Sequence, residues 1–387
     1  MLLEYYSSLN NISLMNDSTS FQHKLWHQLD DFNQLQSSWQ QLLTHCPTHT
    51  IFQTWTWQHC WLSVFKPQTK LWLVTLWQQQ TLIAIAPLYL DDDKVLHIIG
   101  TASDKSQACD NGSFICHPDY PESTALLLDI VLEKKRAWKE LRLHNFHQHN
   151  SRYSETLDYL HEKRYPFINS FLYDAPSRIL GNTQADNALI NHKKFRYFDN
   201  WFKRQGDFNY HHLTEPQAIQ AQLPDFFQQH KARWQITPTP SKFNHALYIQ
   251  FFKRLIEDFA DIKAVHLSFL TLDGEAVAYD FSFYYRQRYL YYTPSDNPNY
   301  AKKSASYLLH KHLLQHLTSI NCRECDYSIG SESYKYKLSN KVYKVNQLRI
   351  FSTYYHYSLN YTRLKLRAWL NARPRLYHLL CKMRGLE

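Results

Sequence analysis

The sequence has little glycine and none of the glycine-rich loops that bind phosphate groups. Only 7 of its 387 residues are Gly. Neither GxGxxG nor GxxxxGK[ST] occurs, which argues against a dinucleotide-binding strand–turn–helix and against a P-loop. The GxSxG nucleophile elbow of the α/β-hydrolases is missing as well. A phosphate site in this chain would therefore have to come from free N–H groups at a helix N-terminus.

Long hydrophobic runs and a cysteine framework are also absent. The most apolar runs, such as 81–90, are much shorter than the roughly 20 residues that span a bilayer. The opening MLLEYYSS lacks the basic start and apolar core of a secretory signal. Seven scattered cysteines do not form a disulfide pattern, and the CxxC of Cys322 and Cys325 has no second pair to complete a zinc site. We expect a soluble, cytoplasmic protein without a metal.

Aromatic and basic residues are abundant. The chain is 44% hydrophobic and 16% aromatic, which is enough to bury sizeable cores, and its length favours two domains. The formal net charge is +9 and the pI is about 9.0. This charge favours an acidic partner, which could be a phosphorylated cofactor, a nucleic acid or an anionic membrane surface.

One order of elements is predicted twice along the chain: hairpin, strand, loop, helix, strand. Alternating apolar residues indicate the strands, and apolar residues at helical spacing indicate the helices. The first copy comprises 71–90, 94–100, 121–136 and 140–146, and the second comprises 265–285, 288–296, 304–317 and 324–330. Asp273-Gly274 supplies the positive φ angles that the second hairpin turn requires.

Helices are predicted between and after the two copies. Three lie between them, at 185–206, 216–234 and 241–260, and Ser241 is a candidate N-cap. The Tyr- and Lys-rich stretch 339–357 is predicted to add strands. From Tyr361 the chain is predicted to form a basic helix that Pro374 interrupts.

The stretch CDYSIGSESYKYK carries the most specific motif. Asp326, Gly330, Glu332, Tyr334 and Lys335 follow the pattern D-x-x-x-G-x-E-x-Y-K. With the order of elements before it, this pattern resembles the CelD-type acetyltransferases, which are akin to the FemAB-like transferases within the GNAT superfamily. The resemblance spans about residues 50 to 340, and includes HKARW at 230–234 and the degenerate first copy.

The resemblance implies an α/β (α+β) fold with two tandem GNAT-like domains, each a mixed, mostly antiparallel sheet flanked by helices. We expect a degenerate N-terminal domain at 21–180, an acyltransferase domain at 181–345, and an extension with a basic helix at 346–387. The activity implied is transfer of an acyl group from acyl-CoA, such as acetyl-CoA, to an amine or hydroxyl of a sugar or other polar acceptor, as in polysaccharide or cell-envelope biosynthesis.

The same resemblance assigns candidate site residues. The catalytic candidates are Asp326, Glu332 and Lys335, and the substrate-binding candidates are Arg233, Tyr292 and Tyr334. The cofactor-binding candidates lie at the turn into the helix: Lys302, Lys303, Ser304, Ala305 and Ser306. Ser306 stands where the family commonly has Gly. We expect the strand 324–330 to place Asp326, Ser328 and Gly330 on one face.

Two alternatives remain at this point. The chain could be a FemAB-like transferase that uses aminoacyl-tRNA, which its basic charge would suit; otherwise nucleic acid is not an expected partner. It could also be a GNAT-like binding module without catalysis. The basic tail either packs on its own domain or anchors the protein peripherally on the anionic inner face of a membrane; its cations are Arg363, Lys365, Arg367, Arg373, Arg375, Lys382 and Arg384.

Overall fold

Two β-sheets of very different size form the framework of the protein. The computed structural model describes residues 21–373, except 103, 105 and 236. The small sheet has the order β1 (Phe21–Trp26), β3 (Leu73–Gln78), β4 (Thr81–Ala86), β7 (Ile115–Cys116). The large sheet has the order β10 (Phe208–Leu213), β11 (Val265–Leu272), β12 (Glu275–Tyr285), β13 (Arg288–Asp296), β14 (Glu324–Asp326), β9 (Phe167–Ile179), β15 (Lys341–Phe351), β8 (Glu140–His147), β6 (Val95–Ile98), β5 (Leu88–Leu90), β2 (Lys70–Leu71).

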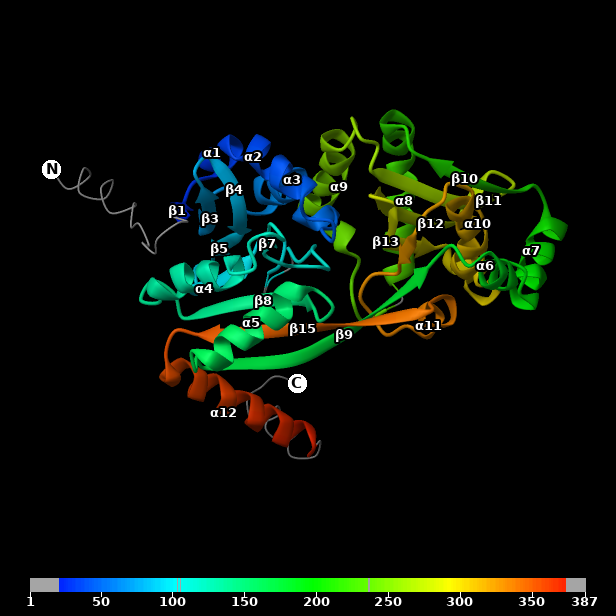
Figure 1. Ribbon diagram of the computed structural model, residues 1–387. Coiled ribbons are helices and arrows are strands. Elements are labelled where there is room, and N and C mark those ends of the chain that lie inside the picture. Colours follow the sequence, from blue (N-terminus) through cyan, green and yellow to red (C-terminus); the bar gives the residue numbers. More distant parts are fainter. Residues whose placement is uncertain (1–20, 103, 105, 236, 374–387) are drawn as a thin grey trace.

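The large sheet is continuous because the two halves of the chain exchange strands. Strand β9 follows β8 in the sequence, yet it pairs antiparallel with β14 of the second half. Strand β15 follows β14, yet it pairs antiparallel with β8 of the first half. The two exchanged strands also pair with each other, and Figure 1 shows them running together across the middle of the molecule. Among the described strands, only β6–β8 and β13–β14 are parallel pairs.

The helices flank both halves of the framework. The described helices of the first half are α1 (Leu29–Gln34), α2 (Gln36–Thr44), α3 (Trp55–Phe65), α4 (Ser123–Glu133) and α5 (Ser151–Glu162). Those that follow are α6 (Thr183–Ile190), α7 (Lys193–Gln205), α8 (Pro216–Gln235), α9 (Ala246–Asp258), α10 (Ala305–Ser319), α11 (Ser333–Leu338) and α12 (Tyr354–Asn371). Short 3₁₀ turns occupy Ile51–Gln53, Lys242–Asn244 and Pro298–Lys303.

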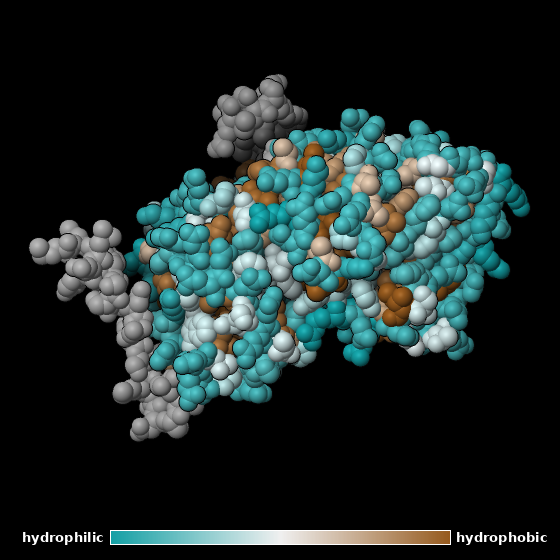
Figure 2. Space-filling view, turned by 90° about the horizontal axis from the view of Figure 1, so that it is seen from above, coloured by the Kyte–Doolittle hydropathy of each residue, from teal (hydrophilic) through white to brown (hydrophobic). Residues whose placement is uncertain are grey.

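An apolar core joins the two halves. Helix α3 of the first half packs on α9 of the second, and the rings of Trp57 and Phe251 meet edge to face at 5.8 Å. Both rings are fully buried, as are Cys60 and Leu255 beside them. Burying apolar surface is the main favourable term in domain association. Seen from above, the surface over this region shows hydrophobic residues as patches between hydrophilic ones (Figure 2).

The fold class and the repeated order of elements are confirmed. Asp273 and Gly274 have φ angles of +50° and +81° in the turn between β11 and β12, as the hairpin required. Ser241 accepts a hydrogen bond from Phe243 N, although it caps the 3₁₀ turn before α9 rather than α9 itself. In the first half the expected hairpin is divided, because β3 and β4 belong to the small sheet while β5 joins the large one.

Some boundaries differ from the predictions. The single helix expected at 185–206 is wrong: α6 ends before Asn191, and the His192 side chain caps a new helix, α7. The strand expected at 324–330 ends at Asp326. The tail helix begins at Tyr354, earlier than predicted, and Pro374 lies outside the described residues. The expected domain limit at 345 falls inside β15, which serves both halves.

Candidate active site

The site lies where β13 and β14 separate. Their parallel pairing runs only from Arg288 opposite Glu324 to Leu290 opposite Asp326. Beyond Asp326 the chain turns toward β9, where Tyr327 N donates to Pro176 O at 3.0 Å. The edge of β13 beyond Leu290 therefore has no strand beside it among the described residues. Side chains of β13 alternate between the two faces of the sheet, so this edge borders a different set of side chains on each face.

One pocket lies on the α10 side of β13, on the face that carries Tyr291; we call it the donor pocket, after the role proposed for it below. Its volume is about 450 Å³. The lining residues are polar or aromatic for the most part: Lys194, Arg233, Trp234, Thr237, Tyr291, Pro294, Asp296, Ser304, Ser306, Tyr307, Glu332, Ser333, Tyr334 and Lys337. The lining includes three cations, Lys194, Arg233 and Lys337, and two carboxylates, Asp296 and Glu332. This excess of positive charge makes the pocket suited to an anionic ligand.

The N-terminus of α10 opens into the donor pocket. Ser304 occupies the N-cap position with φ +51° and ψ +47°, and its side chain does not cap the helix. The left-handed backbone is unfavourable for a residue with a Cβ, and such strain is typical of functional turns. Ser306 lines the pocket one residue into α10. The N–H groups of this first turn, together with the helix dipole, favour a negatively charged group here.

The predicted cofactor residues divide into two sets. Ser304 and Ser306 line the pocket, while Ala305 is buried between them. Lys302 is exposed, and the Lys303 ammonium lies 4.5 Å from the ring centroid of Trp201, so neither lysine lines the pocket. The sequence interpretation placed the glycine-like position at Ser306, whereas the residue with positive φ is Ser304.

Other cations line the pocket instead. The Lys194 ammonium lies 4.8 Å from the centroid of the Tyr307 ring. Arg233 Nε donates to Asp296 Oδ1 at 3.0 Å across the wall formed by α8 and β13. Lys194 comes from α7, so helices distant in sequence contribute charge to the same pocket. The sequence analysis identified Arg233 as a candidate but did not identify Lys194, which belongs to the basic run of α7.

An acceptor pocket lies on the opposite face of β13, the face that carries Leu290. It is small, with a volume of about 60 Å³. Both halves of the chain line it: Pro47, His49, Thr50, Ile51, Phe52, Asp110, Asn111, His147, Phe283, Tyr285, Arg286, Arg288, Leu290, Asp326, Ser328 and Ile329. Because Leu290 and Tyr291 are neighbours on one strand, the two pockets border the same stretch of β13 from opposite sides.

Asp326 is the carboxyl group at the edge of the acceptor pocket. Burial and the nearby Glu324 carboxylate raise the pKa of Asp326 to about 6, against the opposing charge of Arg288. The Asp326 Oδ1 accepts a hydrogen bond from Ser328 N at 2.8 Å. A carboxyl group with a pKa near 6 is largely ionised at neutral pH, yet it is more basic than an ordinary aspartate.

Asp110 joins this cluster from the first half of the chain. Ser328 Oγ donates to Asp110 Oδ2 at 2.5 Å. Burial raises the pKa of Asp110, while the Ser328 hydrogen bond and the charges of Lys242 and Lys335 oppose that rise. Burial also lowers the pKa of Lys242 to about 8. The Asp110 carboxylate opposes this fall, because it favours the charged form of the lysine. Perturbed titrations of this kind concentrate at functional sites.

Lys335 and Glu332 lie between the two pockets. Lys335 Nζ donates to Ile329 O at 2.8 Å and contacts Glu332 Oε2 at 3.2 Å. Gly330 has a φ of +138°, which side chains with a Cβ rarely adopt, and a Cβ there would meet the same Glu332 oxygen. The backbone therefore favours glycine at position 330, and a larger residue would also displace the end of Glu332 from Lys335.

The structure separates the predicted catalytic residues. Asp326 lines the acceptor pocket, whereas Glu332 lines the donor pocket with Arg233 and Tyr334. Tyr292 lines neither pocket, because its hydroxyl donates to Ala108 O at 2.7 Å within the core between the halves. The expected common face of Asp326, Ser328 and Gly330 is not formed, since the strand ends at Asp326 and Ser328 has φ +59°.

A buried histidine lies behind the wall of the donor pocket. His310 of α10 is 1% exposed, and neither ring nitrogen has a hydrogen-bond partner among the described residues. Its ring lies 4.4 Å from Tyr291 and 5.7 Å from Tyr334, both of which line the pocket. Burial and the Lys335 charge lower the pKa of His310 to about 3, so the ring is neutral. Sequence reasoning did not single out this residue.

Comparison with known proteins gives a family match over the second half of the chain. Residues 191–336 match the family described as an acetyltransferase (GNAT) domain. The matched segment contains α7 to α10, β10 to β14 and most of α11, and so includes every residue that lines the donor pocket except Lys337. No curated protein matches the sequence of this chain.

Two of the matched solved structures show the same fold over most of the chain, and a third alignment is weaker. The crystal structure of FemX aligns with a TM-score of 0.54 and 9% identity, covering 79% of this chain and 95% of FemX. The C-terminal domain of a putative lysylphosphatidylglycerol synthetase from Agrobacterium fabrum aligns with a TM-score of 0.50 and 8% identity, covering 82% and 92%. A tandem GNAT protein from the clavulanic acid biosynthesis pathway aligns with a TM-score of 0.49 and 9% identity, covering 85% and 98%.

The described residues give two further findings. They contain no cluster of three or more His, Cys, Asp or Glu side chains arranged to hold a metal ion. Within the same residues, no helix combines the length and the apolar character that crossing a membrane demands.

Proposed function

We propose that this chain, which carries a GNAT acetyltransferase domain at residues 191–336, transfers an acyl group from acyl-CoA to an amine or hydroxyl of a sugar or similar polar acceptor. Acetyl-CoA is the simplest donor, and polysaccharide or cell-envelope synthesis is the proposed setting. One observation carries the proposal: a pocket with three cationic side chains and a carboxyl-lined pocket border the same open edge of β13 from opposite faces.

The donor pocket fits the pyrophosphate of acyl-CoA. The uncapped first turn of α10 offers backbone N–H groups, and Lys194, Arg233 and Lys337 supply positive charge around it. The thioester would then lie in the gap beyond Leu290, where β13 has no neighbouring strand among the described residues. Holding donor and acceptor in one geometry removes much of the entropic barrier to their reaction.

The acceptor pocket supplies the proton acceptor. The ionised Asp326 carboxylate takes a proton from the attacking ammonium or hydroxyl group, directly or through one water. The freed lone pair attacks the thioester carbonyl carbon, a new C–N or C–O bond forms, the C–S bond breaks, and the thiolate leaves; where the acceptor is an amine, the leaving thiolate takes the remaining surplus proton from nitrogen. A backbone N–H on the open edge of β13 stabilises the negative charge on the carbonyl oxygen. Glu332 and Lys335 hold the turn that separates donor from acceptor.

A matched pair of substitutions tests the donor site. Ser306→Asp places a carboxylate at the N-terminus of α10, where the helix dipole favours it but a pyrophosphate is repelled. We expect calorimetric CoA affinity to fall at least tenfold while the melting temperature stays the same or rises. Ser154→Asp makes the same change in the first turn of α5, away from both pockets, and should leave CoA binding unchanged. Equal CoA affinity in Ser306→Asp and the parent would refute this donor site.

Aminoacyl-tRNA transfer is the second candidate, which the net charge of +9 and the structural likeness to FemX favour. The two candidates separate in one assay. Release of free thiol from acetyl-CoA in the presence of amino-sugar acceptors supports the first. Transfer that requires charged tRNA supports the second, and a folded protein that consumes neither donor would be a binding module.

A further inference from the structure

Helix α12 is attached to the protein along one side only. It is 18 residues long, and none of its residues is buried. The Tyr357 ring lies 5.9 Å from Phe351, and Asn360 Oδ1 accepts a hydrogen bond from Arg349 at 2.8 Å. Figure 1 shows α12 below β9, at the opposite edge of the molecule from α2 and α9. Packing of the tail on its own domain therefore leaves most of this helix uncovered.

The uncovered side of α12 carries an apolar stripe. Tyr355, Leu359, Leu366 and Trp369 are separated by four, seven and three residues, which places them on one helical face. Their exposed fractions are 73%, 39%, 54% and 45%. A surface helix of a globular protein normally buries such a stripe against the core. This stripe faces outward, so it is suited to a partner that lies outside the described chain.

The charges of α12 have one sign. Arg363, Lys365, Arg367 and Arg373 lie in or directly after the helix, and no acidic residue occurs from position 352 to 373. The Arg373 guanidinium lies 4.4 Å from the centroid of the Trp369 ring, so positive charge borders the apolar stripe. Exposed aromatic and aliphatic residues flanked by cations are typical of helices that lie in a membrane interface.

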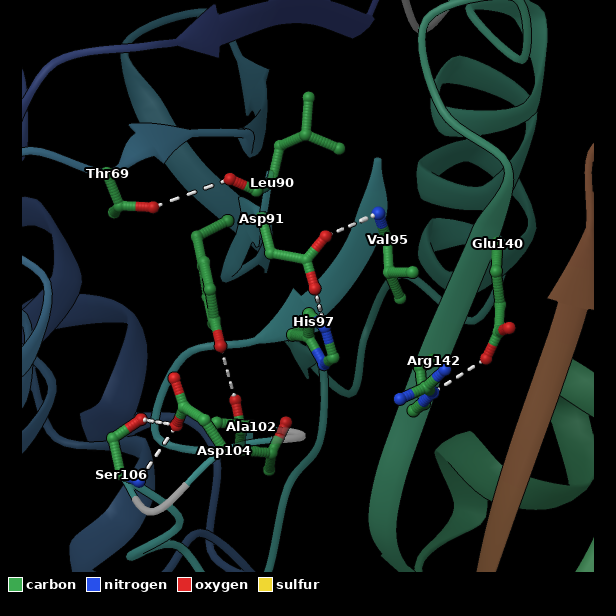
Figure 3. A network of polar contacts seen from close by, with 12 residues as sticks. Thr69, Leu90, Asp91, Val95, His97, Ala102, Asp104, Ser106, Glu140 and Arg142 are labelled. Atoms are coloured by element: carbon green, nitrogen blue, oxygen red, sulfur yellow. Dashed lines mark hydrogen bonds and ion pairs between the residues drawn. The ribbon is translucent and has the colours of Figure 1, made fainter. Parts of the chain in front are cut away.

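A cavity of about 610 Å³ opens between α12 and the large sheet. Arg363 and Arg367 line it and have no ion-pair partner among the described residues, while Leu366 belongs both to this lining and to the stripe. Two more guanidinium groups of the lining, Arg142 and Arg349, contact a single carboxylate, Glu140. Figure 3 shows the Arg142 side of this contact. The cavity is therefore a cationic recess beside an apolar stripe, which is the chemistry of a phospholipid headgroup site.

We propose that α12 docks the protein on an anionic phospholipid surface, with its stripe among the headgroups and a lipid phosphate in the recess. A nucleic acid would satisfy the charges but would leave the leucines exposed. A second copy of α12 would bring like charges together, which disfavours a symmetric dimer through this face. The inference does not depend on the transfer reaction.

Vesicle co-sedimentation of the full-length chain tests the proposal. We expect binding to vesicles of phosphatidylglycerol and phosphatidylcholine in equal parts, little binding to phosphatidylcholine alone, and weaker binding as salt is raised. Arg363→Gln/Arg367→Gln should weaken partitioning about thirtyfold, since each basic side chain near an anionic surface contributes about 1 kcal/mol. Leu366→Ser/Trp369→Ser should weaken it at least tenfold without removing charge.

Arg196→Gln/Arg204→Gln is the matched control, because it removes the same charge from another basic helix, α7, at exposed positions. This control should bind vesicles within about twofold of the parent. Melting curves of all variants should superimpose, since the substituted side chains are exposed. The proposal is overturned if the parent does not bind anionic vesicles, or if the control and Arg363→Gln/Arg367→Gln lose vesicle affinity to the same extent. It is also overturned if the two α12 variants abolish RNA binding, or dissociate a dimer in solution, and leave vesicle binding unchanged.

Discussion

Replacing Asp326 with Asn should slow catalysis and stabilise the protein at the same time. As the general base, Asp326 acts on the attacking group and not on the donor. Loss of a general base typically costs a hundredfold to ten-thousandfold in rate. We therefore expect kcat to fall at least a hundredfold, with CoA affinity unchanged. In the parent, kcat should rise with pH through about 6, the pKa of Asp326, and level off above it.

Although Asp326→Asn should lower kcat, it should raise the free energy of unfolding. The pKa of Asp326 is raised from 3.8 to about 6 by burial, so the folded state holds the proton more tightly than the unfolded state. The free energy of unfolding of the parent should therefore fall as pH rises from about 4 to above 6. At about 1.4 kcal/mol per pKa unit, the charged carboxylate destabilises the fold by up to about 3 kcal/mol at pH 8. Asn carries no such charge.

Free-thiol release and urea unfolding, measured at pH 4.5 and pH 8, give both readouts. The stability gain of Asp326→Asn over the parent should be about 1 kcal/mol at pH 4.5 and approach its limit of about 3 kcal/mol at pH 8. Glu162→Gln, at an exposed carboxylate at the end of α5, should change neither measurement. If Asp326→Asn turned over like the parent, the general-base assignment would be refuted; if it were less stable than the parent at pH 8, the raised pKa of Asp326 would be refuted.

Three further substitutions test the structure around the site. His310→Phe should raise the free energy of unfolding by about 1 to 2 kcal/mol, because it removes two buried nitrogens without partners among the described residues; a lower melting temperature would contradict this. Arg178→Met should cost about 3 to 5 kcal/mol in urea unfolding, since it leaves the buried Asp186 without its guanidinium, and a loss below 1 kcal/mol would count against it. Burial would raise the pKa of Asp199, but hydrogen bonds from its neighbours, including Lys311, lower it overall. Its carboxylate therefore stabilises the fold most above about pH 4, and Asp199→Asn should cost about 2 kcal/mol at pH 7, a cost that shrinks steadily as the pH falls below 4.

Local patterns in the sequence predicted the elements but not all of their ends. The alternation of β11 and β12 and the turn at Asp273-Gly274 are local, so a short window was enough to predict them. The break between α6 and α7 depends on His192, whose side chain caps α7 although histidine is not among the usual N-cap residues. The strand at 324–330 ends early because Tyr327 bonds to Pro176, a partner that no local pattern reveals.

Only part of the candidate site could be predicted from the sequence, again because a residue from a distant segment completes it. The motif from Asp326 to Lys335 marks the second half of the chain, and it includes residues of both pockets. Asp110 completes the acceptor pocket from the first half, in a loop with no motif of its own. Its position depends on the packing of α3 against α9, and packing between distant elements is set by shape and burial rather than by spacing.

The exchange of β9 and β15 explains why this packing is fixed. Because each half supplies the strand that pairs with the other, the halves cannot move apart without breaking backbone hydrogen bonds along β8, β9, β14 and β15. Buried strands left unpaired would cost far more than a side-chain contact does. The loop that bears Asp110 is thereby held against Ser328 at hydrogen-bond distance, and the acceptor pocket persists although its walls come from residues 47 to 329. The first half thus forms one wall of the acceptor pocket, even though the matched acetyltransferase segment lies wholly in the second.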